Sequence, residues 1–250
     1  MNLVEASTPF QSPREGAVVD MLVLHYTGTQ TAKEALDILS GKTGKEVSSH
    51  YTVDEDGTVY AHVPEDQKAW HAGISHWRGR DNINANSIGI EIVNPGHEFG
   101  YRAFPEAQMR AVAKLCQDIL ARHPAIEPRN VVGHSDVAPA RKGDPGELFD
   151  WPYLAKYGVG VWPDFPYRSI SNINLLCKGD EGERVASLQQ RLAEYGYGVP
   201  KSAVFCEETL FSAIAFQRHF RPQDCSGVWD GDSDARLDEL LAHVHNRPAS

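Results

Sequence analysis

The sequence contains no apolar run that approaches the roughly 18 residues needed to cross a bilayer as a helix. We therefore expect no membrane span. Basic residues are also few, because 24 Lys and Arg stand against 34 Asp and Glu, giving a formal net charge of −10. Such an acidic chain is a poor partner for nucleic acid or for an anionic membrane surface. The charged fraction of 23% is nevertheless ordinary for a globular protein and argues against a disordered chain.

Cysteine is scarce, and its four positions show no C-x-x-C spacing. A disulfide framework and a cysteine-based zinc site of that spacing are therefore not expected. Cys116 falls on the apolar stripe of a predicted helix and is interpreted as a small core residue. A bridge between Cys206 and Cys225 is left open.

The first residues lack a basic start followed by an apolar core, so no secretory signal is expected in this numbering. Three explanations stay open. Export uses another route, a signal has been trimmed, or the protein stays inside the cell.

The segment from Val131 to Trp151 organises the rest of the chain. A short apolar run ends at His134, and the prolines and glycines that follow are predicted to keep the segment free of helix and strand. Long irregular loops inside compact domains are usually functional. The segment also carries Asp144, and imidazole with carboxylate is a ligand combination of catalytic zinc. A third ligand is expected elsewhere.

A second histidine stands at the end of another apolar strand, in the run M-L-V-L-H-Y-T from Met21 to Thr27. Two strands that each end in a histidine can bring both rings to one edge of a sheet. His25 is therefore the candidate third ligand, although a single histidine after a strand is more often structural.

Five blocks of sequence together resemble the type 2 N-acetylmuramoyl-L-alanine amidases. They are L-H-Y-T around His25, S-S-H-Y-T-V-D-E-D-G-T-V at 48–59, A-W-H-A-G at 69–73, S-I-G-I-E at 87–91 and H-S-D-V-A-P-A-R-K-G-D-P-G at 134–146. The resemblance runs in order from about residue 20 to residue 151. It implies a zinc enzyme that cuts the amide between N-acetylmuramic acid and the first alanine of the peptidoglycan stem peptide.

The pattern of predicted elements indicates an α/β domain with a mixed sheet flanked by helices. Helices are expected over 31–40 and over 105–123, where apolar residues recur at helical spacing. The E-D-G turn between 51–54 and 58–63 predicts a β-hairpin. Residues 87–93 alternate isoleucines with Gly89 and Glu91 and predict a strand, and 131–132 predicts the closing strand.

The character of the chain changes after residue 160. Residues 161–175 are rich in proline and aromatics and are interpreted as a packed linker. Three short helices are predicted within 176–250, and their V-x-x-L-Q, A-I-x-x-F-Q and G-x-W-D-G patterns resemble the three-helix peptidoglycan-binding domain. We expect an amidase domain over 1–160, with its core at about 20–151, and this helical domain after the linker. A generic helical cap is the alternative.

The resemblance also assigns chemical roles. It implies Zn²⁺ held by His25, His134 and Asp144, with Glu91 as general base. The carboxylate of Glu91 lies on an otherwise apolar strand, on the face opposite the isoleucines, where it is costly unless paired or used. Lys142, two residues before the aspartate ligand, would stabilise the oxyanion. Some phage lysozyme-type relatives use a tyrosine where this chain has Ser49, which removes that option and strengthens Glu91.

Further residues are predicted to line the substrate cleft, and His50 and His71 are alternative candidates for the third metal ligand. Arg141 is a fork-shaped donor suited to a substrate carboxylate. The full set of predicted substrate contacts is Tyr26, Trp70, His71, Asn82, Asn84 and Arg141.

The sequence disfavours two other function classes. A recognition protein that has lost catalysis is disfavoured because all the implied ligands are present, and a zinc peptidase of the commonest type is disfavoured because H-E-x-x-H is absent. The expected partner is peptidoglycan, through its glycan strand and stem peptide. A wall-binding domain favours polymeric murein in the periplasm or cell wall, whereas the missing signal favours soluble anhydro-muropeptides in the cytoplasm. The oligomeric state is not predicted.

Overall fold

The computed structural model describes residues 2–163 and 175–246. Its centre is a six-stranded sheet in the order β1-β5-β4-β9-β3-β10. These strands are β1 (Leu3–Glu5), β3 (Met21–Tyr26), β4 (Tyr51–Val53), β5 (Val59–Ala61), β9 (Ser87–Ile92) and β10 (Val131–Gly133). In this sheet β1 and β5, β4 and β9, β9 and β3, and β3 and β10 pair parallel, whereas β4 and β5 pair antiparallel. The predicted mixed sheet is confirmed.

Shorter elements surround the sheet. The two-stranded pairs are β2 (Gln11–Pro13) with β6 (Gln67–Ala69), and β7 (His76–Trp77) with β8 (Arg80–Asp81). The helices of this part are α1 (Ala32–Leu39), η1 (Ile83–Asn86), α2 (Gly96–Phe99), α3 (Glu106–Arg122), η2 (Pro128–Asn130), α4 (His134–Val137) and α5 (Trp151–Lys156). The helices predicted over 31–40 and 105–123 are thus present. Thr31 starts α1 by accepting the Glu34 backbone N–H through its side chain.

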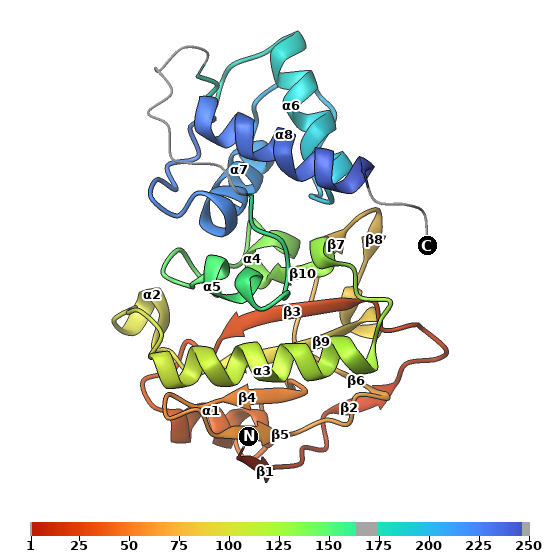
Figure 1. Cartoon of the computed structure of the whole chain (residues 1–250), viewed down its shortest axis with the longest axis vertical. Coiled ribbons are helices and arrows are strands. Elements are labelled where there is room, and N and C mark those ends of the chain that lie inside the picture. The colour runs from red at the N-terminus through yellow and green to blue at the C-terminus, as the bar shows by residue number, and fades with distance from the viewer. Residues whose placement is uncertain (1, 164–174, 247–250) are drawn as a thin grey trace.

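Helix α3 lies across one face of the sheet (Figure 1). Its apolar stripe packs on the three isoleucines of β9, which are all fully buried together with Val53 and Val59 of the hairpin. The alternation seen in the sequence therefore has its expected meaning. The isoleucines face α3, and the remaining residues of β9 face the other side of the sheet.

The chain ends in three helices, α6 (Glu183–Tyr195), α7 (Glu207–Phe220) and α8 (Gly231–His245), which form the upper part of the molecule in Figure 1. They share one apolar cluster with the opposite face of the sheet, which includes Met21, Val23 and Val132 as well as Phe216 and Leu240. The helical part and the sheet are therefore packed against each other. Most of the predicted linker, residues 164–174, lies outside the described residues.

One expectation about the organising segment was wrong. Residues His134–Val137 of this segment form the helical turn α4, although the segment was predicted to contain no helix. The turn forms because the carboxylate of Asp136 accepts the Gly133 backbone N–H at 2.7 Å and the first proline comes only at Pro139. The rest of the segment, up to α5, contains turns and bends without regular structure.

The segment before β3, residues 2–20, contributes two strands. β1 adds an edge strand to the sheet next to β5, and β2 pairs with β6. All four cysteines are free, so the bridge left open between Cys206 and Cys225 is not formed. None of the helices in the described parts of the chain is both long and apolar enough to cross a membrane.

Candidate active site

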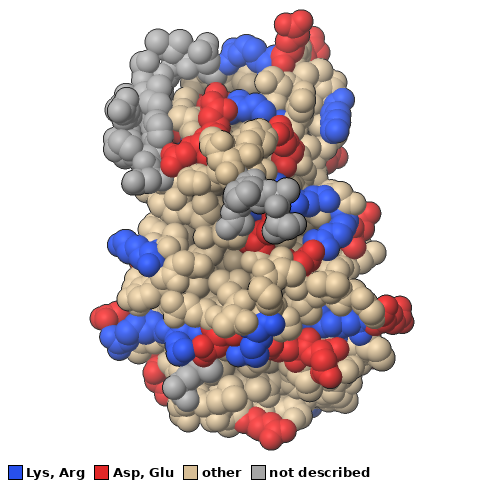
Figure 2. All heavy atoms as spheres, turned by 45° about the vertical axis from the view of Figure 1, so that its right-hand side comes forward, with Lys and Arg blue, Asp and Glu red and all other residues tan. Residues whose placement is uncertain are grey.

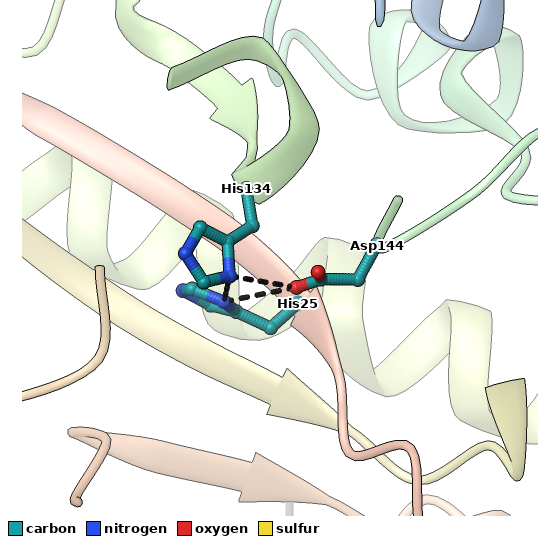
Figure 3. A group of neighbouring side chains, drawn as sticks. All are labelled: His25, His134 and Asp144. Carbon is teal, nitrogen blue, oxygen red and sulfur yellow. Dashed lines mark hydrogen bonds and ion pairs between the residues drawn. The ribbon is translucent and has the colours of Figure 1, made fainter. Parts of the chain in front are cut away.

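Three predicted ligands converge at the edge of the sheet (Figure 3). Nδ1 of His25 lies 2.9 Å from Nδ1 of His134 and 3.1 Å from Oδ2 of Asp144, and Nδ1 of His134 lies 3.0 Å from the same oxygen. His25 comes from β3, His134 begins α4, and Asp144 comes from the loop that follows. All three side chains are buried. Within the described residues, this is the one group of His, Cys, Asp and Glu with the geometry of a metal site.

The outer nitrogens of both rings are engaged in ways that leave Nδ1 free to bind a cation. Nε2 of His134 donates to the Ala72 carbonyl at 3.1 Å, so the lone pair of that ring is on Nδ1. Nε2 of His25 lies 3.0 Å from Nδ1 of His71, and Nε2 of His71 lies 3.1 Å from Oγ of Ser87. The hydroxyl of Ser87 donates to the Ile83 carbonyl, so the simplest arrangement has each ring donating through Nε2.

The donor set fits zinc. Tetrahedral zinc with bonds of about 2.0–2.1 Å places its ligand atoms roughly 3.3 Å apart, close to the separations of these three atoms. Burial, together with the proximity of His134, lowers the pKa of His25 to about 4. Burial alone would raise the pKa of Asp144, but His134 and His25 outweigh it and hold that pKa far below its usual range. A neutral imidazole and an ionised carboxylate are the forms that bind metal.

Glu91 lies on the same face of the sheet as His25, because the two residues are paired in register between β9 and β3. Burial, reinforced by the charge of Asp144, raises the pKa of Glu91 well above its ordinary value. Its buried Oε2 has no hydrogen-bond partner among the described residues. A buried carboxylate with an unused oxygen beside a metal site is a candidate proton acceptor.

A cleft of about 630 Å³ opens over these groups. It is lined by eight of the predicted residues, namely Tyr26, Trp70, His71, Glu91, His134, Arg141, Lys142 and Asp144. Lys142 is half-buried, and its positive charge is close enough to lower the pKa of both Glu91 and His25. The guanidinium of Arg141 donates to the carbonyls of Ala72 and Ile74, so at least part of its capacity holds the neighbouring loop.

The remaining predicted contacts have other surroundings. Asn84 accepts the backbone N–H groups of His71 and Ala72 through its side-chain oxygen, and Asn82 is an exposed residue before η1. Neither belongs to the lining of the cleft. His50 is not part of this group of donor atoms, and both of its ring nitrogens are engaged, since the Gly89 backbone N–H donates to Nδ1 and Nε2 contacts the Gln67 carbonyl.

His71 lines the cleft and also supports the site by contacting Nε2 of His25. Its ring lies against Gly89, where an added Cβ would stand only 2.5 Å from Cγ of His71. The glycine in S-I-G-I-E therefore makes room for the ring that contacts His25. A glycine between two isoleucines of a strand is the signal that could have revealed this close approach.

Arg14 was not predicted to serve the site. It is buried and donates to the backbone carbonyls of Glu65, Asn84, Ala85 and Ser87. These hydrogen bonds connect the segment before β3 to the chain that enters β9. A single arginine in an irregular segment carries no periodic signal, so the sequence could not have shown it.

Comparison with known proteins shows which family this chain resembles. Residues 15–147 match the sequence profile of the N-acetylmuramoyl-L-alanine amidase family, Amidase_2. The chain is 40% identical over 238 residues to N-acetylmuramoyl-L-alanine amidase AmiD of Escherichia coli, covering 89% of this chain and 82% of that protein.

The chain belongs to the N-acetylmuramoyl-L-alanine amidase family. The amidase is also similar in structure to E. coli AmiD solved with the substrate anhydro-N-acetylmuramic acid-L-Ala-D-gamma-Glu-L-Lys, with a TM-score of 0.77 and 38% identity over 94% of this chain and 92% of that one. AmpDh3 of Pseudomonas aeruginosa matches with a TM-score of 0.75 and 32% identity, over 90% and 92% of the two chains. These structural matches extend beyond the profile and include the C-terminal helices.

Another relative matches over a shorter stretch of the chain. The amidase is 42% identical over 106 residues to 1,6-anhydro-N-acetylmuramyl-L-alanine amidase AmpD of Salmonella typhimurium, which is 42% of this chain and 54% of that protein. The predicted fold and the predicted enzyme class are thus confirmed.

Proposed function

We propose that this amidase hydrolyses the amide between N-acetylmuramic acid and L-alanine of peptidoglycan with the help of zinc held by His25, His134 and Asp144. The observation that carries the proposal is the convergence of three donor atoms from buried side chains within 2.9–3.1 Å of one another, beside Glu91, whose buried Oε2 has no hydrogen-bond partner among the described residues. Bound zinc supplies a Lewis acid and lowers the pKa of a coordinated water to about 7.

Glu91 is the general base in this proposal. Burial raises the pKa of Glu91 well above its ordinary value, which makes its carboxylate a stronger base than an exposed one. The unpaired Oε2 takes a proton from the attacking water and then gives it to the leaving amine of L-alanine. Ser49 cannot replace it, because that hydroxyl is buried and donates to the Tyr51 carbonyl.

Lys142 stabilises the negative charge that develops on the carbonyl oxygen of the substrate. It lines the cleft two residues before Asp144 and faces the same group of charges. An ammonium in a partly dehydrated cleft is worth more to a developing oxyanion than to a ground-state carbonyl. Tyr26, Trp70 and Arg141 form the walls against which sugar and stem peptide lie.

Peptidoglycan fits the amidase better than a polyanion does. On the face that Figure 2 shows, Lys and Arg alternate with Asp and Glu and no continuous basic surface is visible. The relatives AmiD and AmpDh3 were solved with anhydromuramyl peptides. The three C-terminal helices, with their resemblance to peptidoglycan-binding domains, support action on polymeric murein in the periplasm or cell wall.

Product analysis tests the proposed bond. Purified sacculi and an anhydromuramyl tripeptide are incubated with the amidase, and the products are identified by mass spectrometry. We expect peptides that begin with a free L-alanine amine, together with glycan that carries no peptide. Cleavage within or between stem peptides would identify a zinc peptidase instead, and binding to sacculi without any cleavage would identify a recognition protein.

A further inference from the structure

A buried carboxylate next to the metal site is held by the C-terminal helices. Asp136 is the third residue of α4, two positions after His134, and is fully buried. Its Oδ1 accepts the hydroxyl of Tyr197 at 2.6 Å, and its Oδ2 accepts Nδ1 of His219 at 2.7 Å and the Gly133 backbone N–H at 2.7 Å. A carboxylate so deeply buried requires such partners. Two of the three come from the helical part of the chain.

Both donors are themselves fixed. The ring of His219, in the last turn of α7, stacks on Trp151 with ring centroids 3.7 Å apart and an interplanar angle of 19°. Tyr197 follows α6 and packs edge-on against Trp77, with centroids 5.1 Å apart. Each of these side chains thus has a ring contact of its own, and its hydrogen bond links Asp136 of α4 to the helical part of the chain.

Helix α4 connects this network to the ligands. It begins with His134, and its Ser135 backbone N–H donates at 2.9 Å to the carbonyl of Asp144. Helix α7 also reaches the ligand loop directly. A Cβ added to Gly143 would stand 3.7 Å from Cζ of Arg218. The guanidinium therefore lies beside Gly143, the residue that separates Lys142 from Asp144.

We propose that Tyr197 and His219 are positioning residues of the amidase. Through Asp136, the helical part would then position α4 and with it the metal ligand His134, in addition to any role in binding the cell wall. The proposal rests on the proposed zinc function. It differs from simple packing between two parts of a protein, because it assigns the effect to two hydrogen bonds on one carboxylate.

The test measures zinc affinity separately from stability. The variants Tyr197→Phe and His219→Phe keep each ring and remove its hydrogen bond to Asp136. Zinc dissociation constants are measured by chelator competition, and melting temperatures are measured on the metal-free proteins. Leu240→Ala is the matched control, because Leu240 is fully buried in α8 within the same apolar cluster.

We expect the double variant to bind zinc about 10-fold more weakly, as for other groups that orient metal ligands from behind. Leu240→Ala should lower the melting temperature without changing the zinc affinity. Compared with His219→Phe, the variant His219→Asn should recover part of the lost zinc affinity, because the asparagine amide N–H would lie near the position of Nδ1 of His219.

The possible failures are distinguishable. If the wild-type protein binds no zinc, the proposed function itself is wrong. If the wild type binds zinc and the double variant binds it equally well, the positioning role is overturned. Loss of affinity in Leu240→Ala in proportion to its stability would also overturn it, because the effect would then be general.

Discussion

Gly89 shows how single residues at this site depend on one another. The ring of His71 occupies the space that a side chain at this position would need, and the same ring contacts Nε2 of His25. His71 was predicted as a wall of the substrate cleft and considered as a metal ligand. Its place behind His25 adds a supporting contact, which only the three-dimensional register of β9, β3 and the 69–73 segment makes apparent.

Lys142 allows a test at the residue scale. We expect Lys142→Met to lower kcat about 100- to 1,000-fold with little change in KM, because the ammonium is needed mainly when the oxyanion develops. Steady-state kinetics on an anhydromuramyl tripeptide measure both constants. Lys45→Met is the matched control, since Lys45 lines the same cleft and is not assigned to the chemistry. An increase in KM alone would instead make Lys142 a binding residue.

Glu65 allows a test at the scale of elements. It lies between β5 and β6, and its carboxylate accepts hydrogen bonds from the Tyr51 hydroxyl and from Arg122 and His123 at the end of α3. Burial alone would raise its pKa, but these three partners outweigh burial and lower the pKa to about 2. The carboxylate therefore stabilises the fold when it is ionised.

The sign of the pH effect follows from the lowered pKa. The stabilisation is present above 4.5, the ordinary glutamate value, and is lost as the pH falls toward about 2. We expect Glu65→Gln to lower the free energy of unfolding by about 2–3 kcal/mol at pH 7, and by progressively less in acid. Denaturant unfolding at several pH values measures this. Glu106→Gln, which breaks an exposed pair with Arg110, should have little effect at any pH, and an equal loss in both variants would contradict the assignment.

The sequence predicted most elements because their signals are local. The isoleucine alternation of β9 and the apolar stripe of α3 report which face is buried, and both are present as expected. Helix α4 was missed because it is a single turn. Asp136 accepts the nearby Gly133 backbone N–H, but the two other partners of its carboxylate, Tyr197 and His219, lie more than 60 positions away. Contacts over such distances leave no periodic signal.

Part of the candidate site could be predicted from the sequence, as could most elements of the fold. The positions of His25 and His134 after apolar strands, and the resemblance in five blocks, pointed to the group that the fold brings together. Asn82 and Asn84 were predicted as cleft residues, but the side-chain oxygen of Asn84 is taken by two backbone N–H groups and Asn82 is exposed elsewhere. Side-chain direction after a strand cannot be inferred from sequence alone.

At the scale of the whole molecule, the sheet and the C-terminal helices share an apolar cluster. Trp77 of β7 is fully buried and lies against Gly196, where an added Cβ would stand 2.7 Å from the indole. We expect Trp77→Ala to cost about 3–5 kcal/mol of stability and to weaken protection from hydrogen exchange in β3 and in α8 together. Loss of protection in α8 alone would contradict the shared core.

The central claim is that a zinc held by three side chains works with Glu91. The most direct measurement determines zinc content and hydrolysis of an anhydromuramyl tripeptide for the wild type and for Glu91→Gln in parallel. The account predicts about one zinc per chain in both proteins, with products released by the wild type alone. A wild type without zinc would contradict the metal site, and full turnover by Glu91→Gln would contradict the general base.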